Sequence, residues 1–185
     1  MGYAGGAPEN PTYYMIGTHS ETVEIDYDPT VITYGDLLDV FWTSHDPTIM
    51  SYSKQYKSVI FYHNDEQKTL AMLSKEQEET SRGRKIQTEI VPFSAFYLAE
   101  DYHQKYYLQQ NGEIMREFKA IYGNKGDFFN STAAARINGL LGRNGKLESL
   151  REQIGTFGLS TAAQQRLLKI LGDSTRASNG LCPLW

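Results

Sequence analysis

Cysteine is nearly absent from this sequence, since Cys182 is the only one among 185 residues. A single thiol cannot form a disulfide within its own chain, and it cannot supply a cysteine-rich zinc site. The sequence therefore excludes the disulfide frameworks of small secreted domains and the zinc fingers. It leaves one thiol, which can pair only with another molecule.

Long apolar runs and an excess of basic residues are also missing. No stretch reaches the roughly 18 consecutive apolar residues of a membrane span, and the first residues lack the basic and apolar regions of a secretory signal. We therefore expect a cytoplasmic protein with no membrane partner. A formal net charge of −4 gives no basic footprint for nucleic acid. The sequence has no phosphate loop, nucleophile elbow or dinucleotide fingerprint.

The first 111 residues indicate strands that alternate with helices. Alternating or continuous apolar residues predict three strands, over 22–28, 58–63 and 85–91. Apolar residues at helical spacing predict three helices, over 34–44, 65–81 and 99–110. Such alternation is typical of an α/β or α+β domain.

After Asn111 the character of the sequence changes. Glycines become frequent, and every periodic segment has helical spacing. The predicted helices are 114–121, 131–141, 147–154 and 161–171. Thr161 and Gln164 have the spacing of a capping box at the start of the last one. We therefore expect two domains, 1–111 with the sheet and 112–185 as a helical extension that ends in a mobile tail.

Single polar residues are weak evidence of function. Glu21 follows His19 and Ser20 at the start of the first predicted strand, where loss of water would favour a protonated carboxyl that can act as an acid. A solvated glutamate at a strand edge explains the same residue without any function. Glu100 and His103 have the spacing of half a di-iron site, but the other half is absent from the sequence. We therefore expect no metal site.

The order of the motifs is far more informative than any single motif. Along the chain they are Gly2-Tyr3-Ala4-Gly5-Gly6, Pro11-Thr12-Tyr13, His19-Ser20-Glu21, Tyr27-Asp28-Pro29, Phe41-Trp42-x-x-His45-Asp46-Pro47-Thr48, Gln55-Tyr56-Lys57-Ser58, Thr88-Glu89-Ile90 and Phe96-Tyr97-x-Ala99-Glu100-Asp101-Tyr102-His103-Gln104. Over residues 2 to about 110 this series resembles the A-type peptide methionine sulfoxide reductases. Residues 112–185 resemble, more loosely, the helical C-terminal region of animal members of that family.

The resemblance implies an α+β fold of the ferredoxin-like kind, a two-layer mixed sheet with helices. It also implies reduction of methionine (S)-sulfoxide, free or in proteins, which restores an apolar thioether from a polar lesion. In the family, a cysteine thiolate at a helix N-terminus attacks the sulfoxide sulfur. A second cysteine condenses with the resulting sulfenic acid, and thioredoxin, or dithiothreitol in an assay, reduces the disulfide. The resemblance implies no bound cofactor.

Site residues are carried over position by position. Glu21 matches the acid of the family, and Tyr13 and Tyr56 match the two tyrosines that hold the sulfoxide oxygen. Cys182 is a candidate resolving cysteine. The partners that the resemblance implies are proteins containing methionine sulfoxide, free methionine sulfoxide and thioredoxin.

The chain departs from the family pattern at the most reactive position. The family's Gly-Cys-Phe-Trp-Gly motif lies upstream of Gly-Tyr-Ala-Gly-Gly, which here follows Met1 directly. The nucleophile, together with the first strand and helix of the fold, is therefore not in the sequence. Loop 49–54 carries no acid, whereas the family usually has an aspartate there. Lys57 stands where an arginine is usual, and a lysine cannot form the planar, two-point hydrogen bonds of a guanidinium.

The missing nucleophile leaves three interpretations open. The first is a reductase whose sequence is incomplete and starts at an internal methionine; without a core strand, such a chain is expected to fold poorly or self-associate. The second is a non-catalytic module that binds oxidised methionine or a partner. The third is a chain that uses Cys182 as a substitute nucleophile.

Overall fold

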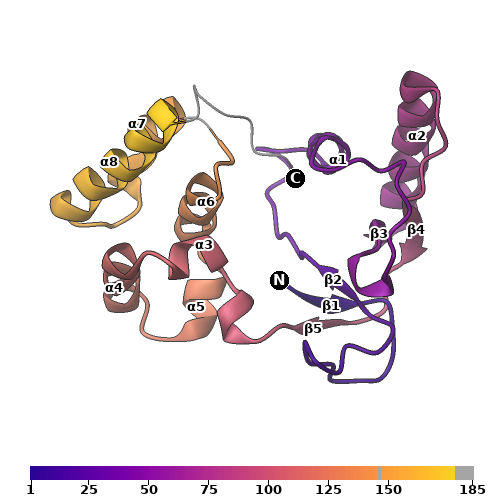
Figure 1. Cartoon of the computed structure of the whole chain (residues 1–185), viewed down its shortest axis with the longest axis horizontal. Coiled ribbons are helices and arrows are strands. Elements are labelled where there is room, and N and C mark those ends of the chain that lie inside the picture. The colour runs from indigo at the N-terminus through magenta and orange to yellow at the C-terminus, as the bar shows by residue number, and fades with distance from the viewer. Residues whose placement is uncertain (146, 178–185) are drawn as a thin grey trace. The chain divides into compact units, whose positions relative to one another are not determined.

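The computed structural model describes residues 1–145 and 147–177, and the chain divides into two compact units (Figure 1). One unit extends from Met1 to Glu100, and the other begins at Asp101. Cys182 lies outside the described residues. The other residues expected to form the sulfoxide site all lie in the first unit.

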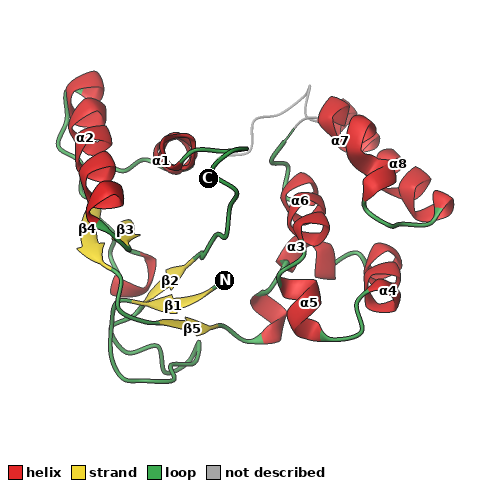
Figure 2. Cartoon of the chain, turned by 180° about the vertical axis from the view of Figure 1, so that it is seen from behind, coloured by secondary structure: helices red, strands yellow, loops and turns green. Residues whose placement is uncertain are grey.

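Two small sheets form the frame of the first unit (Figure 2). The antiparallel sheet has the order β2-β1-β5 and contains β1 (Gly2–Ala4), β2 (Ser20–Thr22) and β5 (Phe96–Leu98). The other sheet pairs β3 (Val59–Tyr62) with β4 (Glu89–Pro92) in parallel. In the antiparallel sheet, Tyr3 lies opposite both Glu21 and Tyr97. The register therefore sets Glu21 across from the middle of β1.

The two helices of this unit, α1 (Tyr34–Thr43) and α2 (Asp65–Arg82), begin at well-formed caps. The Thr33 hydroxyl accepts the Asp36 N–H at 3.1 Å, and the Asp36 carboxylate accepts the Thr33 N–H at 2.8 Å, which completes a capping box. Asn64 accepts the N–H of the third residue of α2 at 2.9 Å. The helices predicted over 34–44 and 65–81, and the strand predicted over 58–63, are confirmed.

A small apolar core joins these helices to β3. Its buried members are Leu38, Trp42, Ile60, Ala71 and Ile86. The Trp42 side chain is only 1% exposed, and its indole N–H donates to the Ser74 hydroxyl at 3.1 Å. Because Leu38 and Trp42 are four residues apart, they share one face of α1. That face holds α1 against α2 and β3.

Two predicted strands differ from the structure. The segment 22–28 is strand only at its beginning, and Val23 and Ile25 are more than half exposed. The reason is the register, because Thr22 already pairs with Gly2, the first residue of β1. The strand expected over 85–91 begins only at Glu89, since the Gln87 N–H bonds to the Pro47 carbonyl at 2.8 Å instead of to β3.

The helix predicted over 99–110 is broken. The structure has a short 3₁₀ turn, Asp101–His103, followed by one turn of α-helix, α3 (Tyr106–Gln109). Between them Lys105 has φ +48°, a left-handed conformation that stops a right-handed helix.

The second unit is helical throughout its described residues. After α3 it contains α4 (Gly112–Ile121), α5 (Lys125–Phe129), α6 (Thr132–Leu141), α7 (Leu147–Gln153) and α8 (Thr161–Ala177). Leu108 on α3 is fully buried in the core of this unit, beside residues such as Ile114, Phe118 and Leu167. The segment 101–111 therefore packs with the helical unit, whereas the sequence placed the boundary after Asn111.

The cap of α8 is Ser160, not the predicted Thr161. The Ser160 hydroxyl accepts the Ala163 N–H at 3.2 Å. Glu117 on α4 then holds Ser160 with both carboxylate oxygens, one accepting its N–H at 2.8 Å and the other its hydroxyl at 2.7 Å. The predicted partner, Gln164, instead donates to the Leu159 carbonyl at 2.9 Å.

Glu117→Gln is expected to weaken the acid dependence of the helical unit. The Ser160 N–H, and then its hydroxyl, lower the pKa of Glu117 below its ordinary value of 4.5. A lowered pKa in the folded state stabilises the fold above that ordinary value, and the stabilisation is lost as pH falls through the folded pKa. Urea unfolding at pH 7 and pH 3 should show a smaller difference for the variant. An unchanged difference would show that this carboxylate does not contribute.

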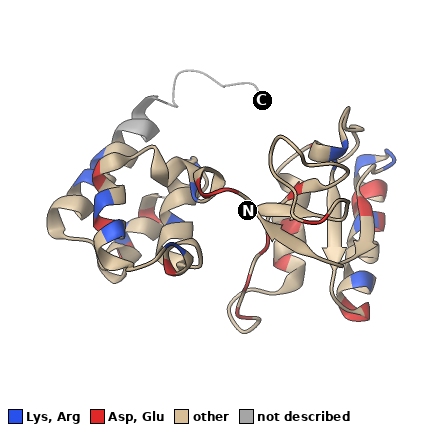
Figure 3. Ribbon diagram, turned by 90° about the horizontal axis from the view of Figure 1, so that it is seen from below, with Lys and Arg blue, Asp and Glu red and all other residues tan. Residues whose placement is uncertain are grey.

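Acidic and basic residues are interspersed over the described parts of both units (Figure 3). Among the helices that the structure describes, none combines the length and the apolar character needed to cross a membrane. The interspersed charge therefore does not single out one face of either unit as a binding site.

Candidate functional site

Glu21 occupies the middle of β2, and two hydrogen bonds attach the segment before Tyr56 to that strand. The Ser20 hydroxyl donates to the Lys54 carbonyl at 2.9 Å, and the Gln55 side-chain amide donates to the Glu21 carboxylate at 2.7 Å. Lys54–Tyr56 is a single 3₁₀ turn whose start is capped by the Ser53 hydroxyl. This anchoring brings Tyr56 to the side of Glu21.

Tyr56 is hydrogen-bonded to Tyr13 through their side chains. That bond, followed by desolvation and the nearby Tyr13, Glu21 and Tyr52, raises the pKa of Tyr56 to about 12. A bond that raises a phenol pKa is one that the phenol donates, because it favours the protonated form. Tyr56 is therefore a neutral hydroxyl at physiological pH, and at 47% exposure it can be reached from solvent.

The structure thus brings together three residues that are distant in sequence: Tyr13, Glu21 and Tyr56. Tyr13 lies in the loop between β1 and β2, Glu21 on β2, and Tyr56 at the end of the 3₁₀ turn before β3. The sequence prediction grouped these residues through the family resemblance. Their proximity in space is a property of the fold.

The loop that carries Tyr13 is closed at its base by His19. This histidine is buried; its Nδ1 accepts the Gly6 N–H at 3.1 Å, and its Nε2 donates to the Pro8 carbonyl at 2.7 Å. These two bonds require the tautomer with hydrogen on Nε2. His19 therefore has a structural place in the loop that its sequence context did not reveal.

Glu100 is the site residue whose role the sequence missed. One of its carboxylate oxygens accepts the Tyr3 hydroxyl at 2.7 Å, and the other accepts the backbone N–H of Tyr13 at 2.9 Å. Among the described residues, no group of three or more histidines, cysteines or acids is arranged to hold a metal ion. The sequence drew attention to Glu100 through its spacing from His103, whereas the structure shows its contacts with Tyr3 and Tyr13.

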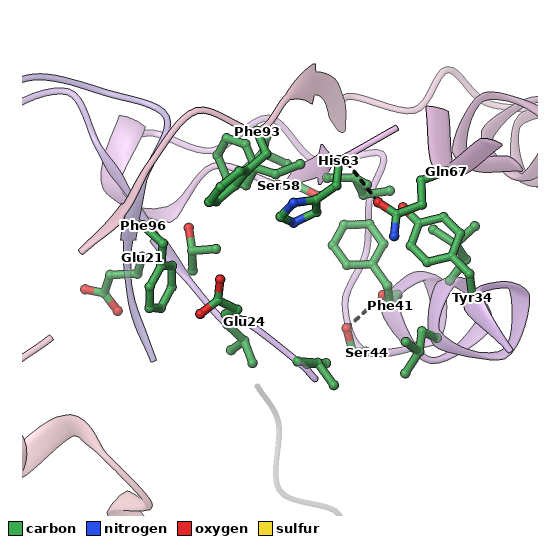
Figure 4. Close-up of a pocket in the computed structure, with 18 of the residues that line it drawn as sticks. Glu21, Glu24, Tyr34, Phe41, Ser44, Ser58, His63, Gln67, Phe93 and Phe96 are labelled. Carbon is green, nitrogen blue, oxygen red and sulfur yellow. Dashed lines mark hydrogen bonds between the residues drawn. The ribbon is translucent and has the colours of Figure 1, made fainter. Parts of the chain in front are cut away.

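A cavity of about 590 Å³ has Glu21 at one end of its lining, with the carboxylate directed away from the other labelled side chains (Figure 4). Glu21 and Tyr56 contribute to its wall, and much of the remaining wall is aromatic, including Phe41, Phe93 and Phe96. Its volume lies within the roughly 300–1,000 Å³ of small-molecule sites. The wall is largely apolar, but it also carries further charged and polar side chains such as Glu24, Lys57 and His63.

Lys57, the residue after Tyr56, forms a salt bridge with Glu89 on β4. The distance from its ammonium nitrogen to the carboxylate oxygen is 2.7 Å. The ion pair links the segment just before β3 to the first residue of β4. Lys57 therefore has a defined partner despite the loss of the bidentate geometry that an arginine would offer.

Comparison with known sequences gives these residues a context. The family model described as "Peptide methionine sulfoxide reductase" matches residues 1–132. The peptide methionine sulfoxide reductase MsrA of Methanosarcina acetivorans is 49% identical over 132 residues, which cover 64% of this chain and 70% of that protein. The peptide methionine sulfoxide reductase of Drosophila melanogaster is 40% identical over 167 residues, 89% of this chain and 67% of that protein.

Solved structures of methionine sulfoxide reductases are also similar to this chain. Mxr1 from Saccharomyces cerevisiae in reduced form superposes with a TM-score of 0.54 at 35% identity, covering 60% of this chain and 70% of that one. Methionine sulfoxide reductase A of Corynebacterium diphtheriae gives a TM-score of 0.50 at 30% identity, covering 60% and 62%. The expected α+β fold is confirmed, and so is the expected family activity, reduction of methionine sulfoxide, which the names of these relatives state. The chain belongs to the peptide methionine sulfoxide reductase family.

Proposed function

We propose that Tyr13, Tyr56 and Glu21 form the site that receives the sulfoxide oxygen of an oxidised methionine. The observation that supports this is their convergence, with a Tyr56 hydroxyl that stays protonated, at the edge of a largely apolar cavity. A sulfoxide oxygen is a strong hydrogen-bond acceptor, whereas the methyl group and side chain attached to sulfur are apolar. The site offers a surface for each part.

The chemistry that these residues would assist is oxygen transfer to a thiol. A thiolate attacks the sulfoxide sulfur and forms an S–S bond while the oxygen takes up a proton. The oxygen then bonds to the thiol sulfur as the S–S bond and the original S–O bond break, which leaves a sulfenic acid and releases methionine. Neutral hydroxyls and a carboxyl beside the oxygen stabilise and protonate it as that bond breaks. A second thiol then displaces water from the sulfenic acid to form a disulfide, which a dithiol reduces.

We assign Cys182 the resolving role, thioredoxin the role of electron donor, and the (S)-epimer of methionine sulfoxide, free or in proteins, the role of substrate. A chain whose sequence contains one cysteine suits a reducing compartment, and we place its activity in the cytoplasm.

Titration with the N-acetyl methylamide of methionine (S)-sulfoxide, followed by amide NMR, tests the oxygen site. Tyr56→Phe removes one hydroxyl donor and should weaken binding about 2–12-fold, the effect of one net hydrogen bond of 0.5–1.5 kcal/mol. Glu21→Gln and Tyr13→Phe should also weaken it. Tyr107→Phe, at 49% exposure in the helical unit, is the matched control and should not change it. Equal affinities in all four variants, or no shifts at millimolar ligand, would reject the proposal.

A second candidate function, binding without turnover, is favoured by the single cysteine of the sequence, because attack followed by resolution requires two thiols. Incubation of the chain and of Cys182→Ser with the same sulfoxide and dithiothreitol, with chromatographic detection of the thioether product, separates the alternatives. Sulfoxide bound but not reduced assigns the chain a binding role. Product that disappears in Cys182→Ser assigns Cys182 a reactive role in this chain.

A further inference from the structure

Tyr13 lies near the tip of the long loop that joins β1 to β2. At its base the Thr18 N–H donates to the Ala7 carbonyl at 2.9 Å and His19 bonds to Gly6 and Pro8, and at its tip the Met15 N–H donates to the Thr12 carbonyl at 3.0 Å in a local turn around Tyr13. The residues beyond Tyr13 are open to solvent, with Tyr14 89% exposed and Met15 70% exposed. The bonds within the loop therefore shape its base and its turn but do not connect Tyr13 to the sheet.

Glu100 connects this tip to the sheet. Its carboxylate accepts the Tyr13 backbone N–H at 2.9 Å across 87 residues of sequence. The preceding residue, Ala99, is buried, and its N–H donates to the Met1 carbonyl at 3.1 Å beside β1. Glu100 thus stands at the end of a segment that is itself bonded to the sheet.

Tyr3 fixes the second oxygen of the same carboxylate. The Tyr3 side chain is 1% exposed on the central strand, and its hydroxyl donates to Glu100 at 2.7 Å. On that strand Tyr3 is the residue paired with Glu21. One rigid strand therefore sets the position of Glu21 directly and that of Tyr13 through Tyr3 and Glu100. Hydrogen bonds to an ionised carboxylate are shorter and stronger than neutral ones.

We propose that Glu100, anchored by Tyr3, is a positioning residue that fixes the Tyr13 backbone and so places the Tyr13 phenol against Tyr56. Its consequence for sulfoxide binding rests on the oxygen site proposed above. Both carboxylate oxygens of Glu100 are engaged by Tyr3 and Tyr13, so it acts through Tyr13 and not on the substrate.

Tyr56 provides a readout of this placement that needs no substrate. Its bond with Tyr13 is the largest cause of its raised pKa, ahead of desolvation and of the charges of Tyr13, Glu21 and Tyr52. If the Tyr13 backbone is released, the bond is lost and the pKa of Tyr56 moves from about 12 toward its ordinary value of 10.0. A change in fold stability alone would not produce that selective movement.

The test compares Glu100→Ala with Glu100→Gln in the full chain, by titrating ¹³Cζ-labelled tyrosines between pH 8 and about pH 11.5. In Glu100→Ala, Tyr56 should ionise earlier than in the parent. Glu100→Gln retains a carbonyl oxygen for the Tyr13 N–H and should keep the parent behaviour. Tyr3→Phe removes the anchor but leaves the carboxylate, and should give a smaller movement in the same direction. Amide spectra at pH 7 establish that each variant is folded.

Unchanged Tyr56 ionisation in folded Glu100→Ala would overturn the proposal. If that variant does not fold, Tyr3→Phe decides, and parent-like ionisation in it would overturn the anchoring role. Affinity for the methionine sulfoxide derivative should fall about 2–12-fold in Glu100→Ala and recover in Glu100→Gln. A parent chain that binds no sulfoxide would reject the oxygen site, whereas the Tyr56 titration would still measure the positioning.

Discussion

Trp42→Ala is expected to lower the free energy of unfolding of the sheet-bearing unit by about 3–5 kcal/mol. Trp42 is the largest side chain in a core that contains four other buried residues among those described, and it is 1% exposed. Removal of the indole leaves a cavity and also leaves the Ser74 hydroxyl without its donor at 3.1 Å. Because domains are stable by only about 5–15 kcal/mol, the loss would be a large part of the total.

Hydrogen exchange in α1, α2 and β3, combined with urea unfolding followed by circular dichroism, measures this effect. Trp42→Phe is the matched control, because it retains most of the buried ring and removes the N–H donor. It should cost clearly less than the alanine variant. A loss below about 1 kcal/mol for Trp42→Ala would show that this core does not stabilise the unit.

Local sequence signals predicted the helices of this unit well. Thr33 and Asn64 are preferred cap residues, and each is followed by a segment with one apolar face. The signals are local because a helix makes its hydrogen bonds within four residues. Local signals fail at Lys105, because a lysine side chain gives no indication of the left-handed φ that breaks the helix expected over 99–110.

The strands were harder to predict because their partners are distant. β1 and β5 have three residues each, too few to show a period of two, and neither was predicted. The strand expected over 22–28 had the correct alternation, but a strand continues only where a neighbour accepts its bonds. That neighbour, β1, reaches only as far as Gly2 opposite Thr22.

In the candidate site, too, local motifs were predictable from the sequence, whereas contacts between distant segments were not. Tyr13, Glu21 and Tyr56 were selected because each lies in a recognisable motif of the family. Glu100 also lies in a motif, but its contacts with Tyr3 and Tyr13 span 97 and 87 residues. Such contacts are created by the pairing of β1 with β5, which the sequence did not reveal. The positioning role of Glu100 therefore emerged only with the fold.

Phe118→Ala is the second large effect, an expected loss of about 3–5 kcal/mol in the helical unit. Phe118 is completely buried on α4, with its ring stacked on Tyr122 at a centroid distance of 5.9 Å and tilted against Phe128 at 6.0 Å. Alanine is the better helix former, so the loss would arise from packing between helices and not from α4 itself.

Hydrogen exchange across the unit distinguishes these causes. If Phe118 holds the common core, its truncation should accelerate exchange in α6 and α8 as well as in α4, because Ile137 and Leu167 belong to the same buried cluster. Lys119→Ala, at the exposed neighbouring position, should change stability by less than about 0.5 kcal/mol. Faster exchange confined to α4 would mean that the helices do not share one cooperative core.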